Sequence, residues 1–248
     1  MTIQGRTSGA VQLAPGYQKV LPLANYAPWM NDAEFAAIRA AIEGNTLVDS
    51  YRCYSLWKLV EQAVQHEGDL LEVGVWRGGT GALIAHQASR ARSDSRRSAE
   101  DIFDPSQASR CVFLADTFNG VAKAGPRDSY YRGGEHANTS LKVVESLLGS
   151  LGIGNAILLE GVFPEDTGDL IDDHRFCFCH IDVDVYQSAR DVFEWVWPRL
   201  TVGGIVVYDD YGFYGCEGVT AHVNEIFPDA QRTVIHNLNG QAIVVKTA

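Results

Sequence analysis

A short apolar run, a glycine-rich turn and a helix-like run constrain the fold of this chain more than any other stretch. Residues 69–75 have the composition of a buried strand, residues 76–81 contain three glycines, and residues 82–86 begin a helical pattern. This order is typical of the nucleotide-binding half of a doubly wound α/β fold. We therefore expect a mainly parallel sheet with helices on both faces.

The rest of the chain repeats this alternation of strand and helix. Further strands are expected at residues 111–115, 156–159, 176–181 and 205–208, and helices at residues 55–66, 139–148, 185–200 and 217–227. Two closing strands, 234–235 and 242–245, flank a turn and predict one antiparallel strand near the C-terminus. The predicted fold is α/β, with a doubly wound, mainly parallel, seven-stranded sheet.

One main domain is expected to follow a short extension. Residues 1–50 are predicted to form an N-terminal helical extension or cap, and residues 51–248 the main domain. Residues 119–137 contain four glycines and two tyrosines, and a loop this long in a compact domain is usually a lid or binding loop. Residues 90–109 are polar and are interpreted as an exposed helix end and loop.

Charge and hydropathy argue against several classes of protein. The net charge of -11, without a basic tract, argues against binding to nucleic acid or an anionic membrane. No apolar run approaches the roughly 20 residues that span a bilayer, and residues 1–15 lack a secretory signal pattern. Five scattered cysteines fit a reducing cytoplasm, so a cytoplasmic protein is expected. Cys177 and Cys179 lie in an apolar run and are interpreted as core residues rather than zinc ligands.

Acidic residues follow two of the predicted strands. Asp182 and Asp184 come after residues 176–181, and Asp209 and Asp210 come after residues 205–208. If the strands are neighbours, four carboxylates share one small space and cannot all stay ionised without a cation. A hard divalent ion such as Mg²⁺ satisfies oxygen ligands of this kind. The alternative for the second pair is a turn or helix cap, which Asp also favours.

The glycine-rich turn also restricts the cofactor. A dinucleotide-binding turn needs the pattern G-x-G-x-x-G, but here the second glycine is missing and residues 75–77 would obstruct a diphosphate. A cofactor without phosphates fits better, and the pattern Glu-x-Gly-x-x-x-Gly-Gly resembles the first turn of S-adenosylmethionine-dependent methyltransferases. Asp116, at the end of the second strand, could accept hydrogen bonds from both ribose hydroxyls, or could simply be a turn residue.

Four motifs together resemble the macrocin O-methyltransferase (TylF/MycF/NovP-like) family. They are residues 72–79, 116–120, 180–188 and 203–211, within a match from about residue 50 to the C-terminus. The resemblance implies a Rossmann-like class I methyltransferase that uses S-adenosylmethionine and Mg²⁺ to methylate a natural-product hydroxyl, most often on a sugar. It implies a small-molecule glycosylated acceptor and a homo-oligomer, a dimer or higher. Residues 1–50 and 90–109 contain no motif that can be used for comparison with the family, so the acceptor's identity stays open.

The resemblance also implies roles for single residues. Asp182, Asp209 and Asp210 are the implied metal ligands. Asp184 or Asp182 is the candidate general base, and both carboxylates would face the same side if the strand continued in an extended form. The expected cofactor-binding residues are Glu72, Val73, Gly74, Gly78, Gly79, Thr80, Asp116, Thr117, Phe118, Glu160, Gly161 and Asp182. The expected substrate contacts, each of which could instead be packing or an exposed loop residue, are Tyr130, Tyr131, His136, Tyr211 and Tyr214. His180 is interpreted as a buried, hydrogen-bonded structural residue.

Two other functions stay open. The first is a catechol or phenol O-methyltransferase. Such enzymes commonly carry a lysine shortly after the first metal-binding Asp, and residues 183–187 contain none, which favours a sugar acceptor. The second is a nicotinamide-dependent oxidoreductase or a non-catalytic nucleotide-binding module. The missing glycine argues against the oxidoreductase, and four crowded acids serve no purpose in a bare binding module.

Overall fold

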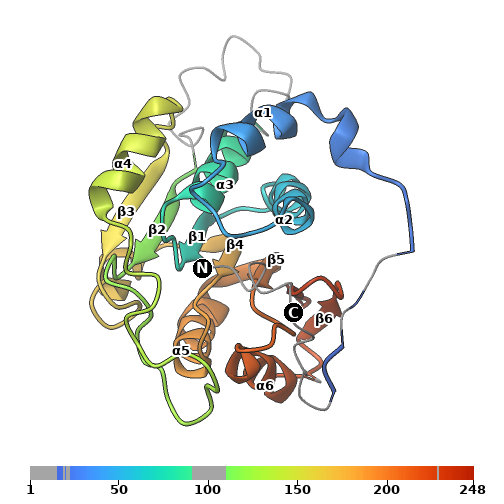
Figure 1. Cartoon of the computed structure of the whole chain (residues 1–248), viewed down its shortest axis with the longest axis vertical. Coiled ribbons are helices and arrows are strands. Elements are labelled where there is room, and N and C mark those ends of the chain that lie inside the picture. The colour runs from blue at the N-terminus through green and yellow to red at the C-terminus, as the bar shows by residue number, and fades with distance from the viewer. Residues whose placement is uncertain (1–15, 19, 21–22, 91–109, 228) are drawn as a thin grey trace, which may run out of the picture.

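The computed structural model describes residues 16–18, 20, 23–90, 110–227 and 229–248 (Figure 1). The expectations for residues 1–15 and 91–109 lie outside these residues. The strands are β1 (Asp69–Val73), β2 (Val112–Asp116), β3 (Ala156–Glu160), β4 (Phe176–Ile181), β5 (Leu200–Tyr208), β6 (Arg232–His236) and β7 (Ala242–Lys246). The α-helices are α1 (Ala33–Ala41), α2 (Ser50–Ala63), α3 (Gly79–Arg90), α4 (Leu141–Ser150), α5 (Tyr186–Val196) and α6 (Glu217–Glu225). Short 3₁₀ helices are η2 (Pro28–Asn31), η5 (Gly168–Ile171) and η6 (Trp197–Arg199).

The seven strands form one sheet in the order β3-β2-β1-β4-β5-β7-β6. Neighbouring strands from β3 to β5 are parallel, and β7 runs antiparallel to both β5 and β6. The predicted sheet, mainly parallel with one antiparallel strand near the C-terminus, is confirmed. None of the helices in the described part of the chain has the length and apolar character needed to cross a bilayer.

Helices cover both faces of the sheet (Figure 1). Leu70 of β1 packs in an apolar cluster with side chains from α1 to α4, whereas its neighbour Leu71 packs in a second cluster with side chains from α5 and α6. Successive strand residues point to opposite faces, so a strand that is covered on both sides must be apolar at nearly every position. Strand β4, in which all six residues are buried, shows this most fully.

The strand register brings distant segments together at one end of the sheet. Ile181, the last residue of β4, pairs with Val73 of β1 and with Tyr208 of β5. The residues that follow these strands, Gly74, Asp182 and Asp209, therefore leave the sheet side by side. This register places the two acidic motifs, which follow β4 and β5, side by side.

Two predicted boundaries differ from the structure. The helix predicted over residues 185–200 ends at Val196, because Pro198 has no N–H to donate and a 3₁₀ turn follows. Strand β5 then begins at Leu200 rather than at residue 205. Helix α2 begins at Ser50 rather than at residue 55, because the Asp49 side chain accepts hydrogen bonds from the first backbone N–H groups of the helix.

The long connection between β2 and α4 is fastened to the helices beside it. Asp128 is buried, and its two oxygens accept hydrogen bonds from the backbone N–H of Tyr186, 2.9 Å away, and of Gly125, 2.8 Å away. Tyr186 is the first residue of α5, and no side chain at its N-cap position caps that helix. Asp128 therefore closes the N-terminus of α5 from a different segment. That the loop moves as a lid stays a prediction.

Candidate active site

A cavity of about 490 Å³ opens where β1, β2, β4 and β5 end. The strand order reverses between β1 and β4, and doubly wound folds bind ligands at such a reversal, outside the carboxyl ends of the strands. The cavity wall comes from three sources: residues 45–49 before α2, the turns that follow the strands, and part of the loop between β2 and α4.

The glycine-rich turn forms one side of this cavity. Gly74 has a φ of +93°, and a Cβ atom at this position would lie 1.8 Å from the carbonyl oxygen of Asp182. Only glycine fits here, because the turns after β1 and β4 touch. Three of the turn residues predicted to bind a cofactor line the cavity: Val73, Gly74 and Thr80. Gly78 and Gly79 lie outside it, against Val144 and Asn45.

Asp116 holds the glycine-rich turn in place. Its Oδ2 accepts hydrogen bonds from the backbone N–H groups of Val75 and Trp76, both at 2.7 Å, and its Oδ1 accepts one from Phe118 at 2.7 Å. A carboxylate offers about four acceptor positions, so roughly one is left for a ligand. Asp116 and Thr117 line the cavity.

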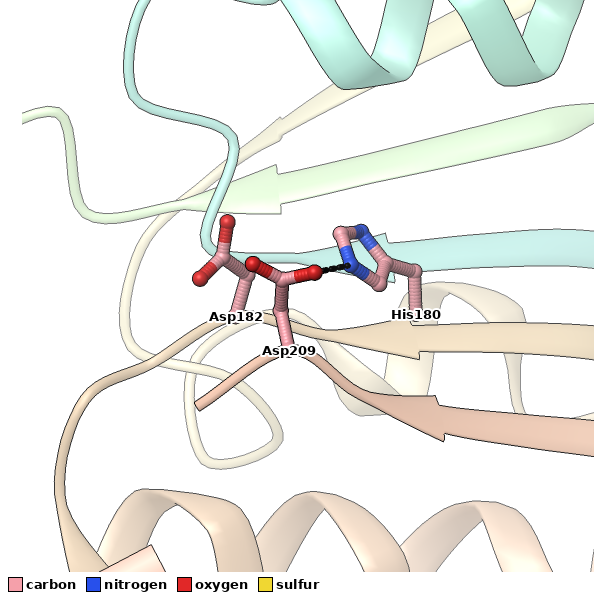
Figure 2. A group of neighbouring side chains, drawn as sticks. All are labelled: His180, Asp182 and Asp209. Atoms are coloured by element: carbon pink, nitrogen blue, oxygen red, sulfur yellow. Dashed lines mark ion pairs between the residues drawn. The ribbon is translucent and has the colours of Figure 1, made fainter. Parts of the chain in front are cut away.

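Four acidic side chains lie together at the cavity wall: Asp182, Asp184, Asp209 and Asp210. They form two groups. Asp182 and Asp209 lie beside one another with His180 on the far side of Asp209 (Figure 2). Asp184 and Asp210 form the other group, with Cys216. Within each group the ligand atoms lie within 4.8 Å of one another. The predicted crowding of four acids is therefore present, but in two clusters.

Asp209 differs from the other acids because cations neutralise it. Its carboxylate forms an ion pair with Arg52 of α2, lies 3.4 Å from His180 Nε2 and accepts a hydrogen bond from Gln241 at 2.8 Å. Burial alone would raise the pKa of Asp209, but these partners outweigh burial and hold the pKa below its ordinary value. Asp209 is thus ionised, and each of its two oxygens already has a partner within the protein.

Asp182 and Asp210 have the opposite electrostatics. Burial raises the pKa of both carboxyl groups well above the ordinary value, and repulsion from neighbouring carboxylates raises it further. The carboxylate of Asp182 accepts no hydrogen bond from any residue that the structure describes. Two carboxylates that have no ion pair with a cationic side chain, one half-buried (Asp182) and one buried (Asp210), fit a hard divalent cation.

Asp184 does not continue strand β4. The strand ends at Ile181 and Asp184 has a φ of +65°, so the condition of an extended chain, under which both carboxylates would face the same side, is not met. The turn is stabilised because the Asp184 N–H donates to Asp210 Oδ2 at 2.8 Å. Burial raises the pKa of Asp184 to about 6, against the lowering effect of hydrogen bonds from Tyr131 and Cys216.

Three of the five predicted substrate contacts line the cavity: Tyr130, Tyr131 and His136. The Tyr131 hydroxyl lies 3.3 Å from His136 Nε2, which is 3.9 Å from Asp184 Oδ2. The two remaining tyrosines do not line the cavity. The chain turns after Asp210, so the hydroxyl of Tyr211 bonds to Asn224 and His236, and the ring of Tyr214 packs against Tyr17.

Three predicted cofactor contacts also lie away from the cavity: Glu72, Phe118 and Glu160. Glu72 is fully buried and its Oε1 lies 2.8 Å from His180 Nδ1. Phe118 packs in the apolar core, and Glu160 is exposed at the end of β3. Gly161, next to Glu160, does line the cavity. His180 is buried between Glu72 and Asp209, as the structural interpretation predicted.

Comparison with known proteins identifies the family. The sequence profile of the Macrocin-O-methyltransferase (TylF) family matches residues 36–232. The chain belongs to this family. The match covers most of the main domain and every acidic motif described above, and it confirms the resemblance that the four motifs predicted.

Individual relatives and a solved structure agree with this family assignment. The chain is 30% identical over 183 residues to an 8-demethyl-8-(2,3-dimethoxy-alpha-L-rhamnosyl)-tetracenomycin-C 4'-O-methyltransferase of Streptomyces olivaceus, a match that covers 69% of this chain and 64% of the relative. It is 30% identical over 185 residues to the mycinamicin III 3''-O-methyltransferase of Micromonospora griseorubida, covering 69% of this chain and 67% of the relative. The chain thus spans about two thirds or less of their lengths. The structure of the O-methyltransferase NovP superposes with a TM-score of 0.66 at 24% identity, covering 82% of this chain and 83% of NovP, which confirms the Rossmann-like methyltransferase fold.

Several residues that line the cavity are not among those that the sequence motifs predict. The most informative is Arg52, which is 8% exposed and lies in the cavity wall. Phe213 and residues 45–49 also line the cavity. One signal was present in the sequence: Arg52 lies one helical turn before Leu56 and two before Val60, on the apolar stripe of α2. A charged residue on a buried stripe needs a partner of opposite charge.

Proposed function

We propose that this protein is an S-adenosylmethionine-dependent O-methyltransferase that methylates a hydroxyl of a glycosylated natural product, with Mg²⁺ held by Asp182, Asp209 and Asp210. One observation carries the proposal: in a chain of this family, the glycine-rich turn and the paired acidic motifs meet on one cavity. The two relatives described above act on a rhamnosyl-tetracenomycin and on mycinamicin III. They support a glycoside as the acceptor here.

The residues around the turn would bind the methyl donor. The cavity volume of about 490 Å³ falls within the usual range for small-molecule sites. Val73, Gly74 and Thr80 would contact the donor on the turn side, and Thr117 and Gly161 on the far side. Asp116 would fix the turn and offer its remaining acceptor position to one ribose hydroxyl.

The acids would divide the chemistry between them. When bound, the cation would lower the pKa of the acceptor hydroxyl and orient its oxygen. The carboxylate of Asp182 accepts no hydrogen bond from the described residues and is therefore the most available ligand for this ion. Asp184 lies in the second cluster with Asp210, within reach of the Tyr131 hydroxyl. We therefore assign the general base to Asp184 rather than to Asp182. Asp184 takes the hydroxyl proton while the acceptor oxygen takes the methyl group and the carbon–sulfur bond of the donor breaks.

Two segments would form the acceptor site. Residues 45–49, at the end of the predicted N-terminal extension, line the cavity wall. So do Tyr130, Tyr131, Glu135 and His136 of the predicted lid loop. We propose that these segments select the acceptor, and that the loop closes after the acceptor binds. A homo-oligomer and a cytoplasmic location stay predictions.

Calorimetry and a transfer assay test the proposal. Purified protein should bind S-adenosylmethionine, and with Mg²⁺ it should add one methyl group to rhamnosylated polyketides in preference to their aglycones or to a simple catechol. Asp182→Ala should abolish transfer and largely keep donor binding, and Asp169→Asn, a change of the same charge on an exposed side chain, should alter neither. Absence of donor binding, or turnover of catechol at the same rate as any glycoside, would contradict the proposal.

A further inference from the structure

Arg52 links the candidate cation site to the cavity wall. Its Nε donates to Asp49 Oδ2 at 2.8 Å, and its NH1 group forms an ion pair with the carboxylate of Asp209 and lies 3.3 Å from the carbonyl oxygen of Asp209. The guanidinium also lies 4.6 Å from the ring centre of Phe213, another wall residue. The side chain is therefore fixed on three sides inside the site.

Arg52 belongs to a buried row of alternating charges. Glu72 pairs with His180, His180 with Asp209, Asp209 with Arg52, and Arg52 with Asp49. Both oxygens of Asp209 are engaged by this row and by Gln241, so one of the three acids assigned to the cation is already neutralised by the protein. Asp182 has no such partner among the described residues.

We propose that Arg52 is a built-in counter-cation of the Mg²⁺ site, which holds Asp209 in the absence of the ion and competes with the ion for it. The proposal rests on the cation site of the proposed function. A divalent ion that binds between Asp182 and Asp210 approaches a carboxylate that a guanidinium already occupies. Arg52 therefore weakens cation binding and keeps one of the acids, Asp209, neutralised when the site is empty.

A purely structural anchor would not need this geometry. The ion pair with Asp49, at the N-terminus of the same helix, fastens the side chain on its own helix. The additional reach to Asp209 crosses from α2 to the end of β5, over 157 residues of sequence, and places a full positive charge beside the candidate ligands. A positive charge in contact with a carboxylate that binds the ion repels a divalent ion strongly.

The test measures affinity for Mn²⁺, as a paramagnetic substitute for Mg²⁺, by electron paramagnetic resonance. Arg52→Gln should bind Mn²⁺ roughly tenfold or more tightly than wild type, because one positive charge near the ion is removed. Arg52→Lys keeps the charge and should stay within about threefold. Lys58→Gln removes one positive charge from the outer side of the same helix, away from the cavity, so it controls for a change in overall charge and should leave the affinity unchanged. Thermal unfolding shows that each variant is folded.

A second measurement uses the wild-type protein alone. Titration with Mg²⁺ should shift the guanidinium Nη signals of Arg52 in a nitrogen-15 NMR spectrum, because NH1 pairs with Asp209 and the ion draws Asp209 away. An unmoved signal, or an Arg52→Gln affinity equal to or weaker than wild type, would overturn the counter-cation. In those cases wild type still binds Mn²⁺, and only the role of Arg52 fails. A wild type that binds no Mn²⁺ would overturn the cation site of the proposed function as well.

Discussion

Replacing Asp128 with Asn should loosen the loop beside the cavity and destabilise the protein. Asp128 is 5% exposed and accepts two backbone hydrogen bonds, from Tyr186 at the start of α5 and from Gly125 in its own loop. The amide of Asn has one oxygen, so one of these N–H groups would face an NH₂ group and lose its partner. The negative charge at the N-terminus of α5 would also be lost.

The expected cost follows from these contacts. A buried donor left without its charged partner costs about 1–3 kcal/mol, and loss of the charge at the helix end adds up to about 1 kcal/mol. The total of about 1–4 kcal/mol corresponds to a fall in Tm of roughly 2–16 °C for a chain of this size. Urea and thermal unfolding would measure it, with Asp169→Asn as the control.

The control removes the same charge from an exposed side chain that has no hydrogen bond or ion pair within the described residues. It should change the unfolding free energy by less than about 0.5 kcal/mol. If Asp128→Asn stayed within that margin too, Asp128 would not hold the loop to α5. Affinity for S-adenosylmethionine gives a second readout, because a detached loop should weaken donor binding together with Tm.

Three further predictions concern the turn, the acids and a buried histidine. Gly74→Ala should prevent folding or lower Tm severely, because the alanine Cβ would overlap the Asp182 carbonyl oxygen. Gly149→Ala, with open space around the glycine, should leave Tm unchanged or slightly higher. Equal Tm values for the two variants would refute the close approach of Gly74 to Asp182. Asp182→Asn should raise Tm in EDTA by relieving repulsion and should abolish stabilisation by Mg²⁺, and a lower Tm in EDTA would contradict the uncompensated charge. Burial lowers the pKa of His222, which lies 3.0 Å from the Tyr208 hydroxyl, to about 4. The unfolded chain therefore binds the extra proton first as pH falls from about 6.5 to 4, and this costs about 3 kcal/mol of stability. In His222→Phe that part of the pH dependence should vanish, and urea unfolding curves that keep the wild-type pH dependence would contradict it.

The sheet was predictable because its pattern is local and redundant. Strand β4 is buried along its whole length, so residues 176–181 had to be apolar at nearly every position, with His180 as the exception, and the buried part of β5 is apolar for the same reason. The neighbourhood of the two acidic motifs followed from the same reasoning, since strand ends of a parallel sheet meet at one edge. The boundaries near Pro198 and Asp49 were less predictable, because each depends on a single residue that ends or begins a helix.

The side-chain pairings could not be predicted from spacing. Glu72 and His180 are 108 residues apart, and Arg52 and Asp209 are 157 apart, so no local pattern reports their contact. The backbone of Asp184 was unpredictable for another reason. A left-handed φ in a residue other than glycine is uncommon, and here it depends on a hydrogen bond from its own N–H to Asp210.

The position of Glu72 changes the meaning of the first motif. The pattern Glu-x-Gly suggests that the acid contacts the cofactor, yet Glu72 is fully buried and its bonded oxygen faces His180. Burial opposes a charged imidazole, but hydrogen bonds to Asp209 and Glu72 outweigh burial and raise the pKa of His180 to about 10. The acid of the turn therefore keeps His180 charged, and charged His180 in turn helps to keep Asp209 ionised. Two residues at the end of β1 and just after it thus serve different parts of the site. Gly74 allows the turn after β1 to contact Asp182, and Glu72, two residues earlier, acts through His180 to keep the candidate metal ligand Asp209 ionised.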